Sequence, residues 1–188
     1  MLTKAKIDEL VSQAYDIACS HGFHEEKLST DHLLMLTIGE VGEAVEAHRR
    51  GKRANTAAFR DTYGSPQPEG REEKHWKFCF ETFIKDTVAD ELADVCIRLF
   101  DLAGTYKMDI LPVQVDVGND YFRENRSFCE RAYDLSVILT RWSTHEAVSH
   151  GIGYIFRWAE ELGIDLMWHI EIKMMYNQMR GYRHGKKY

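Results

Sequence analysis

Apolar residues recur with the spacing of an α-helix along nearly the whole chain, and this period limits the fold more than any other feature. Prolines, which interrupt helices, number only three in 188 residues. The period predicts helices over about 4–21, 30–50, 73–106, 121–142, 144–162 and 165–180. We therefore expect an all-α protein, built as a helical bundle of about five to six helices.

Two segments between these helices lack the period. Residues 51–72 contain glycine and proline breakers and are predicted to form a loop. Pro112 and the stretch VDVGND predict a connector, in which the alternation of VQVDV is also compatible with a short strand. The basic tail GYRHGKKY is broken by glycines, so we expect it to be flexible on its own.

The length of the chain suits one domain over residues 1–188, or two small repeats that share a core. A shift of 56 residues aligns 91–110 with 147–166 without a gap, and the apolar positions stay in register. This alignment would divide the domain into a first half, 1–110, and a second half, 118–188. The second half would then be a degenerate repeat followed by one further helix.

Composition excludes several classes of protein. A hydrophobic content of 44% supports a core, and a formal net charge of −6 gives no basic surface for a nucleic acid polymer. The four cysteines are widely spaced and form no CxxC pair, so we expect reduced thiols, three of them within apolar helices and buried. We see neither a signal sequence nor an apolar run of about 18 residues, so a cytoplasmic protein without membrane contact is expected.

Two pairs of acidic residues stand inside apolar helical segments. Glu40 and Glu43 lie three residues apart, as do Glu91 and Asp94, and each pair shares its helix face with apolar residues. Carboxylates are rarely buried without a partner, and two of them about 4 Å apart repel by about 4 kcal/mol at an effective dielectric constant near 20. Four converging carboxylates therefore predict a bound cation, and oxygen ligands alone favour Mg²⁺ or Mn²⁺.

The proposed repeat does not preserve these acids. In the 56-residue alignment, Glu91 corresponds to Ala147 and Asp94 corresponds to His150. A metal site would then belong to the first half of the chain alone. The acids could instead be solvated residues on an exposed helix face, which is the commoner fate of such a pair.

Three segments carry a family resemblance when they are taken in order. They are LLMLTIGEVGEAVEAHRRGK, DELADVCIRLFDLAGTYKMDI and the closing GIDLMWHIEIKMMYNQMRGYRHGKKY, which together cover roughly 40% of the chain. Their ExxE, ExxD and KMxxNxxR patterns resemble those of the MazG-type, all-α nucleoside triphosphate (NTP) pyrophosphohydrolases. The order of all three segments makes the match more specific than a lone ExxE.

The resemblance implies a function and a set of site residues. Members of such a family cut a nucleoside triphosphate between its α- and β-phosphates with Mg²⁺, act in nucleotide-pool housecleaning, and assemble as dimers or tetramers. Carried over by position, the metal ligands are the four acids Glu40, Glu43, Glu91 and Asp94. The substrate-binding residues of the closing segment are Lys173, Asn177 and Arg180.

Three further residues are candidates for the site. Glu43 is our choice for the general base, although spacing alone does not separate a base from a metal ligand. Tyr176 could contact the base of the nucleotide or could belong to the core. His32 could line a base pocket or could be a surface histidine at the start of a helix.

Several features leave alternatives open. The 47 residues between Glu43 and Glu91 are more than the family usually has, so 51–72 resembles an insertion. Base preference stays open, with deoxypyrimidine triphosphates as the first expectation. A di-iron bundle would need Glu-x-x-His on two helices, and this chain does not supply it. The remaining alternative is a non-catalytic helical module that binds a nucleotide or a protein partner.

Overall fold

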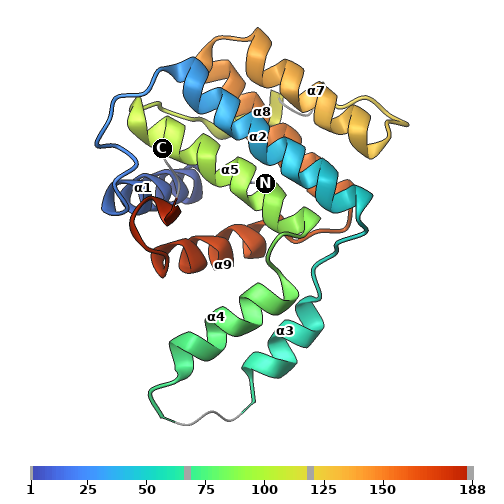
Figure 1. Ribbon diagram of the computed structural model, residues 1–188. Coiled ribbons are helices and arrows are strands. Elements are labelled where there is room, and N and C mark those ends of the chain that lie inside the picture. The colour runs from blue at the N-terminus through green and yellow to red at the C-terminus, as the bar shows by residue number, and fades with distance from the viewer. Residues whose placement is uncertain (1, 66–68, 118–120, 186–188) are drawn as a thin grey trace.

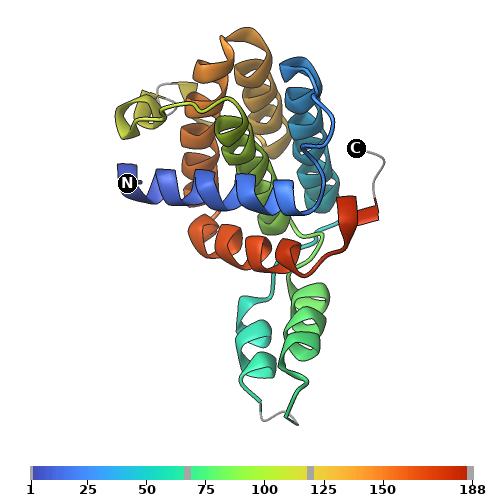
Figure 2. The same cartoon turned by 90° about the vertical axis from the view of Figure 1, so that its left-hand side faces the viewer.

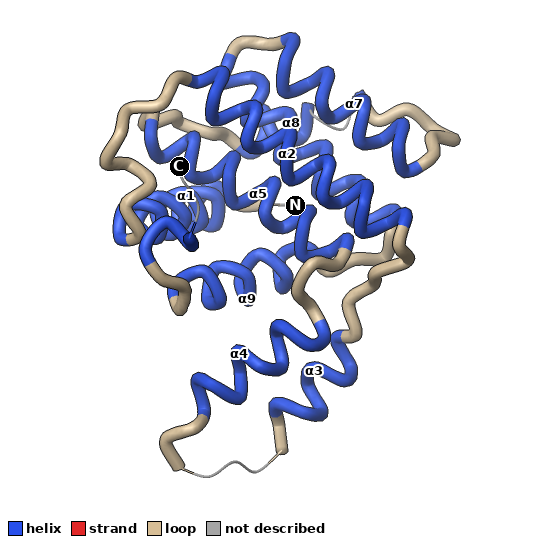
Figure 3. The backbone as a smooth tube through the Cα atoms, viewed as in Figure 1, coloured by secondary structure: helices blue, strands red, loops and turns tan. Residues whose placement is uncertain are grey.

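The computed structural model describes residues 2–65, 69–117 and 121–185, and this part of the chain is helical and contains no strand. Its α-helices are α1 (Lys4–Ser20), α2 (Thr30–Arg49), α3 (Thr56–Tyr63), α4 (Glu72–Phe83), α5 (Val88–Thr105), α6 (Pro112–Val117), α7 (Phe128–Arg141), α8 (Thr144–Glu161) and α9 (Leu166–Gln178). A tight turn, η2 (Tyr182–Gly185), follows α9. The predicted all-α fold is confirmed (Figure 3).

Four helices form the central bundle (Figure 1). Helix α2 packs against α5 and α7, and α8 packs against the same two helices from the other side. Helices α1 and α9 cross the open side of α5, where they run next to each other (Figure 2). Helix α5 therefore has neighbours on every side, and Leu92 and Leu99 on it have no exposed surface. None of the helices that the structure describes has the length and hydropathy needed to cross a bilayer.

Helices α3 and α4 form a hairpin that projects from one end of the bundle (Figure 2). It has its own small core, in which Phe59, Trp76 and Phe80 pack together and against Ile172 and Tyr176 of α9. This small core gives the physical reason that the segment between Glu43 and Glu91 forms two helices. Burying these aromatic side chains stabilises the hairpin in a way that a solvated loop could not achieve.

The two ends of the hairpin are joined by backbone hydrogen bonds. The N–H of Asn55 donates to the carbonyl of Phe83 at 2.9 Å, and the N–H of Val88 donates to the carbonyl of Lys52 at 3.2 Å. The chain thus leaves and re-enters the bundle at adjacent points.

Helix ends follow the capping residues of the sequence. Ser29, Thr87 and Asp165 are the N-caps of α2, α5 and α9, and each side chain accepts a hydrogen bond from the backbone N–H three residues on. Gly163 adopts φ +69° directly after α8, as a glycine at a helix C-terminus commonly does. The expected ends of α2, α8 and α9 are therefore accurate to one or two residues.

Two glycines allow helices to approach each other closely. A Cβ added to Gly104 of α5 would lie 2.6 Å from the Cβ of Tyr15 on α1. A Cβ added to Gly151 of α8 would lie 3.1 Å from side-chain carbons of Leu139 and Leu99. The first contact involves an atom fixed to the backbone, whereas the second involves the ends of two side chains.

Two expectations for the middle of the chain are wrong. Residues 51–72 are not a loop throughout, because Thr56–Tyr63 form α3 around the buried Phe59. Residues 73–106 are not one helix, because the chain turns between α4 and α5. The hydroxyl of Thr87 donates to the carbonyl of Ile84 at 2.6 Å and caps the next helix, and Asp86 has a positive φ of 57°.

The connector and the tail also differ from expectation. Pro112–Val117 form helix α6, for which proline is a favourable first residue, while residues 118–120 lie outside the described part. The helix expected from residue 121 begins at Phe128, because Ser127 forms a capping box with Glu130. In the tail, the N–H of Arg183 donates to the carbonyl of His21 at 2.8 Å, so the described part of the tail is packed.

All four cysteines are free thiols, but fewer are buried than the apolar pattern indicates. Cys79 and Cys96 are buried, whereas Cys19 and Cys129 are exposed.

Candidate metal centre

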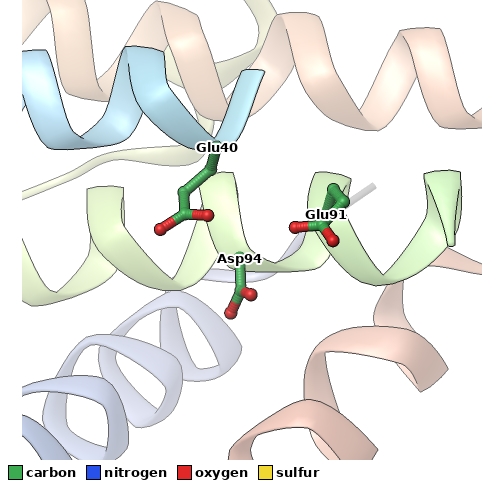
Figure 4. Close-up of side chains that lie close together, drawn as sticks. All are labelled: Glu40, Glu91 and Asp94. Carbon is green, nitrogen blue, oxygen red and sulfur yellow. The ribbon is translucent and has the colours of Figure 1, made fainter. Parts of the chain in front are cut away.

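Three of the four predicted acids meet between α2 and α5 (Figure 4). Oxygen atoms of Glu40, Glu91 and Asp94 all lie within 4.8 Å of one another. Glu40 comes from α2 and is 5% exposed, while Glu91 and Asp94 stand one turn apart on α5. Glu91 is also 5% exposed, so the apolar pattern correctly indicated burial for these two carboxylates.

A second group of acids adjoins the first and was not predicted. Oxygen atoms of Asp86, Asp90 and Glu91 lie within the same distance of one another. Asp90 is 1% exposed, and its Oδ1 has no hydrogen-bond partner within the described residues. Its other oxygen accepts from the backbone N–H of Asp86 at 2.9 Å. The signal that could have identified Asp90 is its spacing of four residues from Asp94, which places both on one face of α5.

Two cations neutralise part of this negative charge. The Nε of Arg98 donates to Oε1 of Glu40 at 2.6 Å. The Nζ of Lys173 lies 2.8 Å from Oδ2 of Asp90 and 2.8 Å from Oδ2 of Asp94. Arg98 was also missed from the sequence, although it lies four residues after Asp94 on the acid-bearing face of α5. Asp86 has its own partner, Lys85, at 2.6 Å. Glu91 has no ion pair within the described residues, so the four other acids, Glu40, Asp90, Glu91 and Asp94, outnumber the two cations beside them and leave a negative charge if all are ionised.

Burial and mutual repulsion disturb the protonation of the acids. Burial raises the pKa of the Glu91 carboxyl to about 8, with further increases from the charges of Asp94 and Asp90. Burial also raises the pKa of Asp90 to about 6, although Lys173 beside it acts in the other direction. For Lys173, burial opposes the charged form, but Asp94 and Asp90 outweigh burial and hold its pKa above the ordinary value. Without a metal, Glu91 therefore keeps its proton at neutral pH.

A cleft of about 100 Å³ opens beside this cluster. Its polar wall contains Glu40, Asp94, Arg98, Asn177 and Arg180, so it brings together two predicted metal ligands and two predicted substrate-binding residues. Asn177 is 7% exposed, and its Oδ1 has no hydrogen-bond partner within the described residues. A buried amide oxygen without a partner is costly, so a ligand with a donor group would be stabilised there.

The other walls of the cleft are mainly apolar and contain Phe23, Leu33 and Leu36. Two further polar residues line the cleft, His24 and Asp101, and Nε2 of His24 lies 2.7 Å from Oδ1 of Asp101. This hydrogen bond raises the pKa of His24 above its ordinary value. The cleft thus combines charged side chains of the acid cluster with apolar side chains from the first turns of α2.

The remaining predicted site residues lie outside the lining of the cleft. Glu43 is exposed, but its charge contributes to the raised pKa of Glu91, so the two carboxylates are neighbours. Lys173 is 4% exposed and is engaged by the two aspartates. His32 is half-buried at the start of α2, where its backbone N–H donates to the Ser29 hydroxyl.

Tyr176 faces the hairpin. Its ring stacks on Phe80 with centroids 4.5 Å apart, and its hydroxyl donates to Glu81 at 2.9 Å. It is 5% exposed, in agreement with the alternative that it belongs to the core.

The donor set fits a divalent metal ion. The three clustered side chains offer only oxygen, their carboxylates exceed the cations that contact them, and one of them keeps a proton that a metal could replace. Comparison of the chain with protein-family models, with curated proteins and with solved structures finds no match. The chemistry of the site must therefore be inferred from its own residues and from the resemblance of its motifs.

Proposed function

We propose that the protein is a Mg²⁺-dependent hydrolase that converts nucleoside triphosphates to monophosphates and pyrophosphate. One observation carries this proposal: the carboxylates of Glu40 and Asp94 line the same cleft as Asn177 and Arg180. Carboxylates alone would repel a triphosphate, so their presence beside a guanidinium and a buried amide favours a cation between acids and phosphates. The ExxE, ExxD and KMxxNxxR motifs give the reaction class.

The metal would be held by Glu40, Glu91 and Asp94, with Glu43 at the edge of the cluster. Mg²⁺ or Mn²⁺ would neutralise phosphate charge there and lower the pKa of a bound water. Binding would displace the proton of Glu91, because its carboxyl has a pKa of about 8 in the metal-free protein. Glu43 remains our candidate for the base that accepts the proton of the attacking water.

The side chains of the cleft would bind the substrate. Arg180 and Arg98 offer guanidinium groups, which can contact phosphate oxygens with two parallel hydrogen bonds. The Asn177 amide offers an acceptor for a sugar hydroxyl or for the edge of a base. Lys173 is assigned a different role from the expected one, because its contacts with Asp90 and Asp94 let it orient the acids rather than touch phosphate.

Cell context and assembly follow from the resemblance alone. We propose a homo-oligomer, a dimer or tetramer, that acts on the nucleotide pool of the cytoplasm. Deoxypyrimidine triphosphates such as dUTP and dCTP are the first substrates to test, and a modified purine nucleotide is the next.

The test is product analysis on the full chain. The protein is incubated with a panel of ribo- and deoxyribonucleoside triphosphates and Mg²⁺, and the products are separated by chromatography. We expect monophosphate and pyrophosphate in equal amounts, and no turnover after chelation of the metal. Orthophosphate as the direct product, or full turnover in chelator, would refute the proposed reaction.

The alternative is a module that binds a nucleotide without cleaving it. The observation in its favour is that Arg98 and Lys173 already engage three of the acids in the metal-free protein. Such a module would bind triphosphates in calorimetry and release no pyrophosphate from any member of the panel. The enzyme and the module are thus separated by one pair of measurements on the same sample.

A further inference from the structure

A second cavity, of about 290 Å³, lies where the hairpin joins the bundle. It is bounded by the C-terminal end of α2, the start of α3, the start of α5 and the turn between α8 and α9. It has no lining residue in common with the cleft beside the acids. Its volume is near the lower end of the range for small-molecule pockets.

Two arginines face this cavity without a carboxylate partner. Arg53 and Arg60 both line it, and neither takes part in an ion pair within the described residues. Arg60 lies over the ring of Trp168, with its Cζ 5.3 Å from the ring centroid. By contrast, Arg49 and Arg50, a few residues earlier, are both paired with Glu46. In a chain of net charge −6, two unpaired guanidinium groups on one cavity are a local positive site.

Besides the two arginines, the lining of the cavity contains a buried histidine and the first turns of two helices. His169 is 3% exposed, and its Nδ1 has no hydrogen-bond partner within the described residues. Burial lowers the pKa of His169 to about 4, so the ring is neutral at pH 7. Thr56 lines the cavity from the first turn of α3, and Ala89 does so from the first turn of α5. Helix N-termini carry partial positive charge, which favours an anion.

One acid opposes this arrangement. Asp165 also lines the cavity. It is the N-cap of α9, and its side chain accepts a hydrogen bond from the backbone N–H of Trp168. The capping bond uses one of its oxygens and leaves a single negative charge against two arginines. The formal charge of the residues that line the cavity therefore stays positive.

We propose that this cavity binds a small phosphorylated anion, either a phosphate monoester or inorganic phosphate or pyrophosphate. The phosphoryl group would lie between Arg53 and Arg60, whose planar guanidinium groups match phosphate oxygens. The volume limits the ligand to the size of a nucleoside monophosphate or smaller and excludes an extended polyanion. Because the ligand would touch both the hairpin and the bundle, its binding would fix the position of the hairpin on α9.

Isothermal titration calorimetry on the full chain tests the site. Phosphate, pyrophosphate and adenosine monophosphate are titrated with chelator present, so that no divalent ion can hold the anion at the acid cluster. We expect Arg53→Ala and Arg60→Ala each to weaken binding by at least about tenfold, or about 1.4 kcal/mol, because each change removes a charged hydrogen-bond donor. Arg50→Ala, which removes an arginine paired with Glu46, is the matched control and should bind as the wild type does.

A change of opposite sign makes the test sharper. Asp165→Asn removes the acid but keeps a good N-cap residue, so it should tighten binding by several-fold without unfolding α9. The proposal is overturned if the wild type binds none of the three anions at millimolar concentration, or if Arg53→Ala and Arg60→Ala bind as tightly as Arg50→Ala.

The three anions also identify the source of the phosphoryl group. Equal affinity for phosphate and adenosine monophosphate would support a site for the phosphoryl group alone. Tighter binding of the monophosphate would support a phosphate ester whose organic part contacts the rest of the lining. Each outcome is independent of whether the acid cleft hydrolyses triphosphates.

Discussion

The two halves of the central bundle bury charge in different ways. In the half made by α7 and α8, Arg131 forms two hydrogen bonds of 2.9 Å with Glu161, and Arg126 binds Asp134 in the same paired manner. In the half made by α2 and α5, Arg98 contacts Glu40, and Lys173 contacts both Asp90 and Asp94. Glu91 has no ion pair there within the described residues. The half made by α7 and α8 has a cation for each of its two acids named here, whereas the other half has more acids than cations.

The difference separates charges that are paired within the fold from carboxylates that the proposed metal ion would neutralise. A buried ion pair with complete hydrogen bonds repays much of its own desolvation, so it needs nothing further. An excess of buried carboxylate is destabilising until a cation joins it. In the 56-residue sequence alignment, the residue of α8 that corresponds to Glu91 is Ala147, which has no exposed surface. An apolar side chain is therefore accommodated at that position of α8.

The largest expected effect compares an aspartate from each half. Under the proposed function, Asp94→Asn should lower kcat/KM by about 10²–10⁴-fold and abolish the rise in Tm expected with Mg²⁺, because a proposed metal ligand is lost. Asp134→Asn should lower stability by about 1–3 kcal/mol through its broken pair with Arg126, and leave the activity of the folded enzyme unchanged. Thermal unfolding with and without Mg²⁺, together with pyrophosphate release, measures both. Equal effects of the two changes on Mg²⁺ binding would remove the distinction between the halves.

The next effect is a dependence of stability on pH that belongs to the acid-rich half. The pKa of Glu91 is about 8 in the folded protein and near 4.5 when unfolded, so the folded state binds the proton more tightly. Stability from this group is therefore fully present below pH 4.5 and is lost as the pH rises to 8. One pKa unit corresponds to about 1.4 kcal/mol, so the loss is on the order of a few kcal/mol.

Glu91→Gln should remove this slope and make the metal-free protein more stable at pH 8 than the wild type. Denaturant unfolding between pH 5 and 8 in chelator, at about half-unit steps, measures it. Mg²⁺ should stabilise the wild type at pH 8 and leave Glu91→Gln nearly unaffected. A variant that is less stable than the wild type at pH 8 without metal would show that the carboxylate supports the fold.

The smallest effect compares a glycine from each half. Gly104→Ala should cost about 1–3 kcal/mol, because the new Cβ meets the Cβ of Tyr15 on the neighbouring α1. Gly151→Ala should cost less, since its Cβ meets leucine methyl groups that can shift. Gly42→Ala on α2 is the control, with no atom within 4 Å, and should gain up to about 1 kcal/mol of helix propensity. Chemical unfolding ranks the three, and a cost at Gly151 equal to that at Gly104 would contradict the order.

Much of the fold could be predicted from local signals. The helical period and the caps Ser29 and Asp165 determine α2 and α9 to within two residues, because these helices begin at strong N-caps. The hairpin could not be predicted in the same way. Helix α3 has eight residues, and Phe59, which makes it stable, contacts Trp168 far along the chain.

The acidic residues of the site could be predicted in part, whereas the residues that contact them could not. Glu40 and Glu91 were found because an acid on an apolar face is unusual. Asp90 was missed because the partner of its buried carboxylate, Lys173, lies 83 residues away in the sequence. Exposure of Glu43 could not be read from its helix face, since the neighbours that would cover that face come from other helices.

The paired hydrogen bonds at Lys52–Val88 and Asn55–Phe83 have a consequence for how such a chain can change over time. A segment whose two ends meet can lengthen, shorten or be exchanged while the bundle beneath it keeps its register, because the closure of a longer loop costs little. The acid cluster lies on α2 and α5, whereas Arg53, Thr56 and Arg60 of the second cavity lie in the segment between the two hydrogen-bonded ends. Mutations in the hairpin can therefore change the lining of the second cavity while the residues of the acid cluster stay the same.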